Sequence, residues 1–342
     1  MTAAALLRAP RSALRRLRAG RRPAVCVVVY HRVAEADVDP WGLCVRPDRF
    51  ADHLDLYGRW GDLLSAGDLG RRLRAGRLPR RAVAVTFDDG YPDNLDTAAP
   101  LLARRGVPAT VFVTTGDEGR TRESWWDELE RVLLLPGALP PTLDGPLGDV
   151  PVRWDLGDAA VYSADRAERH RAWRAWEPPP TSRHALYRHL WERLVERPAR
   201  AQRAALDDFL RWAGHEPAVR PTHRLLSDDG VRNLARTVDV GAHTVTHPAL
   251  PALPPATQRA ELAASRAHLE AVLGRPVRSC AYPYGRASAE TRAAAEAAGF
   301  DVAFTTEPEA ARPDADPLAV PRIAVPDVPA AVLRETLDQA VR

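Results

Sequence analysis

The chain contains no lysine, one methionine and one isoleucine among its 342 residues. All 48 basic side chains are therefore arginines, and 45 acidic side chains leave a formal net charge of only +3. The missing lysine excludes mechanisms that use a lysine nucleophile or Schiff base, and it excludes a Walker-type phosphate loop. A net charge this small for the length, without a recognisable basic motif, predicts no nucleic-acid partner. We attribute the arginine excess to coding bias.

Cysteine and long apolar runs are also scarce. The three cysteines, Cys26, Cys44 and Cys280, form no Cys-x-x-Cys pair, which predicts reduced thiols that bind no metal in a cytosolic protein. No stretch reaches the roughly 18 apolar residues that a membrane-spanning helix needs. With 45% hydrophobic and 27% charged residues, the composition is that of a soluble globular protein.

Residues 1–22 carry seven arginines and no acidic residue. Their apolar run AAALL is shorter than the core of about 7–15 residues in a signal peptide. We predict a disordered basic leader on a cytoplasmic protein. The alternative is a helix whose leucines make weak contact with an anionic membrane surface, which would place the protein peripherally at the inner membrane face.

The rest of the chain alternates between apolar runs and helical patterns. The helical stretches 92–105, 255–273 and 288–298 each end just before a glycine. This alternation predicts parallel βα units, and strands that are apolar throughout are covered on both faces. We therefore predict an α/β barrel over 23–326, followed by a C-terminal helix over 327–342. The seven predicted strands are 24–30, 81–87, 107–113, 238–244, 277–283, 301–306 and 318–325.

The segment 116–225 interrupts this alternation and holds seven of the nine tryptophans. Helical patterns at 125–134 and 182–213 predict a mainly helical insertion after the third strand. Trp125 and Trp126 are candidates for a sugar-binding platform, because aromatic faces suit the apolar faces of pyranose rings. The alternative is that this pair anchors the insertion to the barrel.

Polar motifs follow several predicted strands, at the edge where parallel barrels carry their active sites. TFDDG supplies Asp88 and Asp89, and two such close carboxylates resist joint ionisation unless a cation lies beside them. HTVTH supplies His243 and His247, with Thr244 at the position where an HExxH metalloprotease has glutamate. Two histidines, one aspartate and a water would make an open catalytic site, most naturally for Zn²⁺.

Two further strand ends carry candidate residues. In the motif AYPYG, residues 281–285, the proline presets the backbone so that the Tyr284 amide is predicted to face a substrate oxygen. Tyr282 of the same motif is a candidate substrate contact. His31 closes the first strand, although a single histidine at a strand end is more often structural.

Taken in order, TFDDG, HTVTH and YPYG resemble the polysaccharide deacetylase family, carbohydrate esterase family 4, with its NodB-homology domain. The resemblance covers about 24–120 and 222–326. It implies a distorted barrel of seven or eight strands and hydrolysis of an acetyl group from an N-acetylated sugar with a divalent metal. By motif match, the metal ligands would be Asp89, His243 and His247, the general base would be Asp88, and the Tyr284 amide would stabilise the oxyanion.

The chain departs from the family pattern in two places. Many members carry an arginine shortly before the Pro-Tyr pair, where this chain has Cys280 and Ala281, and many carry a late Leu-x-His acid that is absent here. A subgroup that acts on poly-N-acetylglucosamine instead has Tyr-His near its first strand, which matches Tyr30 and His31. We therefore predict His31 as the general acid and Arg322, on the last strand, as the substitute arginine.

The predicted function is a metal-dependent N-deacetylase that acts on a poly- or oligosaccharide, or on a lipid-linked or nucleotide-linked sugar, and releases acetate. The alternatives are a related C–N hydrolase on a small amide, an O-deacetylase, and a non-catalytic carbohydrate-binding protein. A glycosidase that uses Asp88 and Asp89 is disfavoured, because its carboxylates should stand about 5 Å or more apart across a bond.

Overall fold

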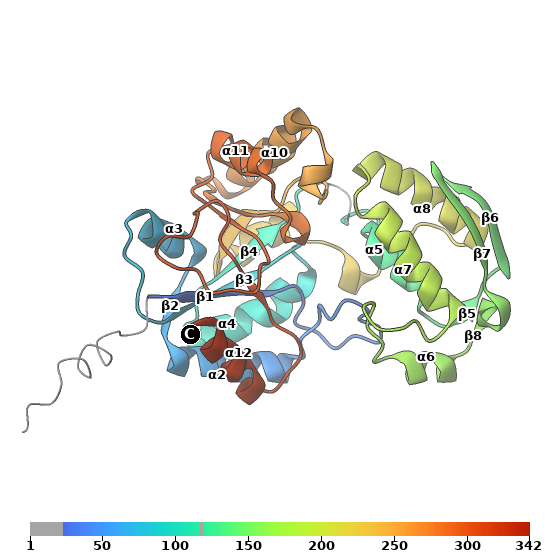
Figure 1. Ribbon diagram of the computed structural model, residues 1–342, viewed down its shortest axis with the longest axis horizontal. Helices are drawn as coiled ribbons and strands as arrows, with labels where there is room; N and C mark the ends of the chain where they lie inside the picture. The colour runs from blue at the N-terminus through green and yellow to red at the C-terminus, as the bar shows by residue number, and fades with distance from the viewer. Residues whose placement is uncertain (1–22, 117–118) are drawn as a thin grey trace, which may run out of the picture.

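The computed structural model describes residues 23–116 and 119–342, so the predicted basic leader, residues 1–22, lies outside the described residues. A parallel eight-stranded sheet forms the centre of the larger part of the molecule (Figure 1). Seven strands follow the path β11-β10-β9-β4-β3-β1-β12, and β2 pairs with β3 beside this path. The strands are β1 Val25–Tyr30, β2 Asp62–Leu64, β3 Ala82–Phe87, β4 Ala109–Val113, β9 Asp239–Ala242, β10 Ser279–Ala281, β11 Val302–Phe304 and β12 Ile323–Ala324.

The two ends of the sheet meet through the segment 320–324. Val320 makes a parallel bridge to Phe304 on β11, and three residues later Ile323 pairs with Val28 on β1. The sheet therefore curls into a barrel whose last strands are very short. This confirms the predicted distorted α/β barrel.

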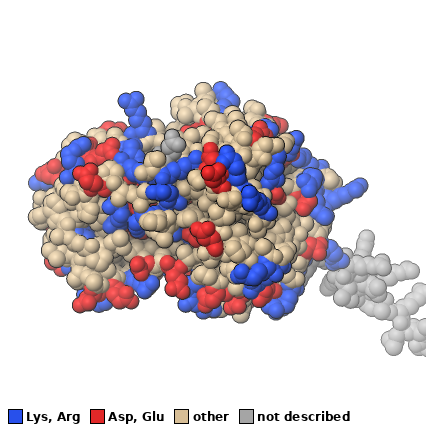
Figure 2. All heavy atoms as spheres, turned by 180° about the vertical axis from the view of Figure 1, so that it is seen from behind, with Lys and Arg blue, Asp and Glu red and all other residues tan. Residues whose placement is uncertain are grey.

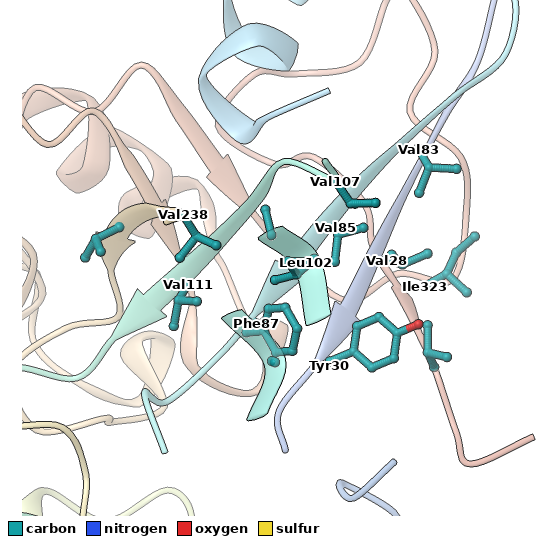
Figure 3. Packing of buried hydrophobic residues seen from close by; sticks show 14 of the residues in the cluster. Val28, Tyr30, Val83, Val85, Phe87, Leu102, Val107, Val111, Val238 and Ile323 are labelled. Atoms are coloured by element: carbon teal, nitrogen blue, oxygen red, sulfur yellow. The ribbon is translucent and has the colours of Figure 1, made fainter. Parts of the chain in front are cut away.

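The barrel core reflects the apolar runs of the sequence. Every residue of β1 and β3 is buried, as expected for strands that are covered on both faces. Val28, Val85 and Phe87 pack against the helical layer that contains Leu102 (Figure 3). The helices of this part are α2 Pro47–Trp60, α3 Ala66–Arg74, the π-helical η1 Asn94–Ala98, α4 Ala99–Arg105, α9 Asp228–Leu234, α10 Pro255–Leu273, α11 Ala289–Ala297 and α12 Ala330–Ala340, with the 3₁₀ turns η4 Leu250–Ala252 and η5 Pro283–Gly285.

The segment after β4 forms a separate lobe beside the barrel (Figure 1). Its own apolar core gathers side chains such as Leu129, Leu186 and Phe209. Besides helices the lobe contains two antiparallel strand pairs, which the helical pattern of the sequence did not indicate. The elements are α5 Trp125–Leu133, β5 Gly137–Ala138, β6 Thr142–Leu147, β7 Val150–Asp155, η2 Gly157–Ala160, β8 Val161–Tyr162, α6 Ala164–His170, α7 Ser182–Leu194, α8 Ala199–Ala213 and η3 Pro221–His223.

The surface matches the near balance of charge. Figure 2 shows arginines and acidic residues interspersed over one face of the molecule, without a large field of either sign. Among the described helices, none combines the length and apolarity that crossing a bilayer would require. Within the described chain all three cysteines are free thiols, and burial raises the pKa of Cys26 to about 12.

Candidate metal centre and active site

Three potential metal ligands converge at the carboxyl edge of the sheet. Asp89 follows β3, and His243 and His247 follow β9. The Nε2 atoms of His243 and His247 lie 3.4 and 3.3 Å from Oδ1 of Asp89, and all three side chains are buried. The motifs TFDDG and HTVTH thus meet at one point, as the sequence predicted.

The backbone is strained at this point. In the described ranges only four non-glycine residues have positive φ, and all four belong to this edge: Asp89 at 73°, Thr244 at 65°, His247 at 54° and Tyr284 at 58°. Such conformations cost free energy and cluster at functional sites. At Asp89 the left-handed turn explains how two consecutive aspartates share one pocket, since on a regular strand they would face opposite ways. Gly90 follows in the same region of backbone conformation, with a φ of 87°.

The ligand atoms fit a small divalent cation. Oδ1 of Asp89 is buried and has no hydrogen-bond partner among the described residues, which suits an atom that coordinates a metal. Nδ1 of His243 lies 2.8 Å from the carbonyl oxygen of Ala281, so Nδ1 carries the proton and Nε2 presents its lone pair. Ligand atoms about 2.0–2.2 Å from a tetrahedral ion are separated by roughly 3.3–3.6 Å. The observed separations of 3.3 and 3.4 Å match this geometry.

The loop between the two histidines is held by a residue that the sequence reasoning missed. Glu261 on α10 accepts hydrogen bonds from the amides of Val245 and Thr246, at 2.8 and 2.9 Å, and from the Thr246 hydroxyl at 2.7 Å. This carboxylate satisfies the donors of the strained turn and so fixes the positions of His243 and His247. Glu261 lies on the helix that follows this loop, 15 positions after Thr246, and the sequence gave no local signal for the contact.

Asp88 lies beside this centre and pairs with Arg322. The guanidinium donates to both carboxylate oxygens, at 2.7 and 2.6 Å, and its Nε donates to the carbonyl oxygen of Thr305 at 2.8 Å. Arg322 is completely buried. Burial alone would raise the pKa of Asp88, but the charge and hydrogen bonds of Arg322, together with the charge of His243, outweigh it and hold that pKa below the ordinary value. Arg322 therefore occupies the place that the sequence assigned to a substitute arginine.

His31 and Tyr284 lie at the same edge. His31 follows β1 and lines the cavity above Asp88 and Asp89, and its carbonyl oxygen accepts a hydrogen bond from Asn94 at 2.8 Å. Tyr284 also lines the cavity, and its hydroxyl lies 3.3 Å from Nδ1 of His247. The phenol of Tyr284 is thus a neighbour of a predicted metal ligand, a contact that the sequence did not suggest.

Two of the predicted substrate contacts are wrong. Trp125 is only 1% exposed and packs in the core of the lobe. Consecutive helical residues point about 100° apart, so Trp126, and not Trp125, faces the cavity. Tyr282 is fully buried, and its hydroxyl donates to the carbonyl oxygen of Leu318 at 2.9 Å, so it supports the barrel and does not line the cavity.

A cavity of about 330 Å³ lies over the centre, between the barrel and the lobe. Trp126 and Trp191 from the lobe and Trp41 from a barrel loop give it an aromatic wall. Trp41 and Trp191 are in contact, with ring centroids 4.3 Å apart. The sequence reasoning missed these two tryptophans, because they are far apart in the chain. The lining residues are His31, Trp41, Leu43, Asp88, Asp89, Trp126, Trp191, His243, His247, Tyr284, Gly285, Arg286 and Thr306.

A second group of possible ligands, Asp127, Glu130 and His223, lies between the lobe and the barrel. Arginines already occupy this cluster: Arg220 donates to Glu130 at 3.1 Å, and an Arg32 nitrogen lies 3.0 Å from Nε2 of His223. These guanidinium groups supply the positive charge that a cation would supply. We therefore assign the cluster to the junction of the two parts and not to a metal site.

Comparison with known proteins agrees with the motifs. The family model for polysaccharide deacetylases matches residues 75–134 and 212–303, which leaves out most of the lobe, and it confirms the family resemblance. The curated protein "Putative polysaccharide deacetylase YxkH" of Bacillus subtilis (strain 168) is 32% identical over 101 residues. That match covers 29% of this chain and 36% of the relative, so the chain aligns with only about a third of the relative's length.

Solved structures share the fold. The Streptococcus pyogenes deacetylase PplD, solved in complex with acetate, superposes with a TM-score of 0.57 at 18% identity, over 92% of this chain and 99% of that one. IcaB from Ammonifex degensii superposes with a TM-score of 0.54 at 19% identity, over 94% and 98% of the two chains. At these identities the likeness extends to the fold alone.

Proposed function

We propose that this chain is a metal-dependent deacetylase that removes acetyl groups from N-acetylated sugars of a poly- or oligosaccharide and releases acetate. One observation carries the proposal. Oδ1 of Asp89, which has no hydrogen-bond partner among the described residues, lies at tetrahedral-edge distance from two imidazole nitrogens. It lies next to Asp88, whose carboxylate Arg322 pairs at both oxygens. The family match supports the same activity.

Asp89, His243 and His247 would hold the cation. When bound, a divalent ion, with Zn²⁺ the best fit to two imidazoles and a carboxylate, would polarise the acetyl carbonyl and acidify a water. Asp88 accepts the proton of the attacking water, because its lowered pKa keeps the carboxylate ionised at neutral pH. Arg322 fixes the direction of the Asp88 carboxylate through its two hydrogen bonds.

The remaining roles fall to the rim of the cavity. His31 donates a proton to the departing sugar nitrogen, a step typically worth about 10²–10⁴-fold in rate. The amide of Tyr284 donates to the developing oxyanion, a contact worth about 3 kcal/mol in other hydrolases. An amine leaving group needs protonation far more than an alcohol does, so the presence of His31 in the cavity favours N- over O-deacetylation.

The aromatic wall supports a sugar substrate. Trp41, Trp126 and Trp191 offer apolar faces to a pyranose ring, and this wall favours a glycan over a small amide. A lipid-linked or nucleotide-linked sugar as the substrate, a cytoplasmic location and membrane contact through residues 1–22 stay predictions.

The activity is tested by incubating the purified protein and Zn²⁺ with chitooligosaccharides. Mass spectrometry should show a loss of about 42 Da for each acetyl group hydrolysed, and acetate should appear in equal amount. Acetylated xylan serves as the O-acetyl comparison. Equal or faster release from xylan would support the O-deacetylase alternative, and release from neither would contradict the proposal.

Metal content separates the roles of the two aspartates. The variant Asp88→Asn should retain one metal ion per chain by elemental analysis and lose deacetylation, because only the base is removed. The variant His243→Ala should lose both metal and activity, since it removes a ligand. Full activity of Asp88→Asn would refute its role as the base, and full metal content in His243→Ala would refute the metal centre.

A further inference from the structure

A chain of two hydrogen bonds joins the catalytic loop to the lobe. Nε1 of Trp126 donates to the hydroxyl oxygen of Tyr91 at 2.9 Å, and the Tyr91 hydroxyl donates to Oδ2 of Asp127 at 2.9 Å. Tyr91 follows Asp88, Asp89 and Gly90 directly in the sequence. Trp126 and Asp127 lie in the first turn of α5, so the link spans the two parts of the molecule.

The direction of both bonds is fixed by chemistry. An indole nitrogen can only donate, so the Tyr91 oxygen must accept from Trp126 and has a single proton left for Asp127. Tyr91 is 1% exposed, and the guanidinium of Arg32 lies over its ring at 4.7 Å. The hydroxyl therefore has one arrangement available.

This link determines where the Trp126 indole lies. Its ring centroid is 4.7 Å from that of His247, and the same ring lines the cavity. The ring contacts Trp125 edge to face, with centroids 5.6 Å apart, but Trp125 leaves the indole nitrogen free to bond elsewhere. The hydrogen bond to Tyr91 is thus the polar contact that holds the Trp126 indole at a fixed position relative to the metal centre.

We propose that Tyr91 is a positioning residue for sugar binding. Its hydroxyl links Trp126 of the lobe to the catalytic loop by a hydrogen bond and so sets the distance between the aromatic wall and the metal centre. This inference rests on the proposed deacetylase function, because it gives the indole a sugar to contact. It assigns a specificity role to a residue that touches neither substrate nor metal.

The first test observes the link without any activity. The protein is labelled with ¹⁵N-tryptophan, and the indole N–H signal of Trp126 is assigned by its loss in Trp126→Phe. In Tyr91→Phe, which removes only the hydroxyl, this signal should shift and its hydrogen should exchange faster with solvent. Tyr162→Phe is the matched control, because it removes a lobe hydroxyl that contacts His170 and does not line the cavity. An unchanged Trp126 signal in Tyr91→Phe overturns the proposal.

The second test observes the consequence for substrate. Tyr91→Phe should raise KM for chitotetraose about fivefold, within the range that loss of one hydrogen bond produces, while kcat for a small aryl acetate and the metal content stay within twofold. In a Trp126→Phe background, Tyr91→Phe should add less than a twofold change, because the bond is already absent. An unchanged KM, or effects of the two substitutions that multiply, overturns the proposal.

Failure of this inference can be told apart from failure of the deacetylase function. If the wild-type protein releases no acetate, the proposed function fails. Adding chitotetraose to the labelled protein then still tests whether the aromatic wall binds the sugar, through the indole N–H signal of Trp126. A shift of the Trp126 signal on addition supports the wall, whereas an unmoved signal overturns it.

Discussion

The guanidinium of Arg322 donates hydrogen bonds of 2.7 and 2.6 Å to the two carboxylate oxygens of Asp88, although 234 positions separate the two residues. Arg322 leads into the last, very short strand of the barrel, and Asp88 follows one of its longest strands. The segment 320–324, which closes the barrel, therefore also brings Arg322 to Asp88, the proposed general base. At the position before Pro-Tyr, where the family resemblance predicts an arginine, this chain has Cys280 and Ala281.

The variant Arg322→Gln tests this pair. It removes the charge that lowers the pKa of Asp88, so that pKa rises and the base becomes protonated at higher pH. We expect the acidic limb of the pH–rate profile to move to higher pH, and the rate at the optimum to fall by on the order of 100-fold through misorientation of the base. The pH dependence of acetate release gives both values.

Arg322→Lys is the matched control. It keeps the positive charge but loses the bidentate hydrogen bonding to Asp88, so the acidic limb of the pH–rate profile should move less while the rate still falls. If Arg322→Gln left the acidic limb in place, Asp88 would not be the group that titrates in the reaction.

His31 is tested by its dependence on the leaving group. His31→Ala should slow acetate release from an N-acetylated sugar by about 10²–10⁴-fold, because the amine then departs without a positioned acid. An aryl acetate releases a stable phenolate and needs no such proton, so its hydrolysis should change by less than about tenfold. Kinetics with both substrates on one protein preparation give the comparison. Equal losses on the two would place His31 in some other role.

Gly285 tests the packing of the YPYG turn. An added Cβ would lie 2.6 Å from both Cβ and the backbone nitrogen of Thr306, at a φ of +67°. We expect Gly285→Ala to lower the free energy of unfolding by several kcal/mol, combining this clash with the cost of about 1–2 kcal/mol for a left-handed residue. Chemical denaturation measures the change.

Gly274→Ala isolates the backbone part of that cost. Gly274 ends α10 at a φ of +65°, and a Cβ there would meet no atom within 4 Å. Gly274→Ala should therefore lower the free energy of unfolding only by the cost of placing a non-glycine residue in the left-handed conformation. If the two variants were equally stable, the close approach of Thr306 would not constrain the turn.

The sequence predicted the barrel and brought the residues of the candidate metal centre to attention, because both depend on local patterns. A strand that is buried on both faces must be apolar along its length, so β1, β3 and β4 could be recognised from composition alone. The proposed ligands Asp89, His243 and His247 occupy short motifs at strand ends, and parallel strands bring their carboxyl ends to one edge.

Side-chain direction and partners across the fold required the tertiary structure. One helical step decides that Trp126 lines the cavity while Trp125 enters the core of the lobe, and no local pattern distinguishes two adjacent tryptophans. The contacts of Tyr91 with Trp126 and of Glu261 with Thr246 join segments that meet only after the chain has folded. The sequence by itself determined which chemistry is available, because that depends on residue types at strand ends. The tertiary structure decided which groups hold that chemistry in place, because hydrogen bonds form between residues that the fold, and not the chain, makes neighbours.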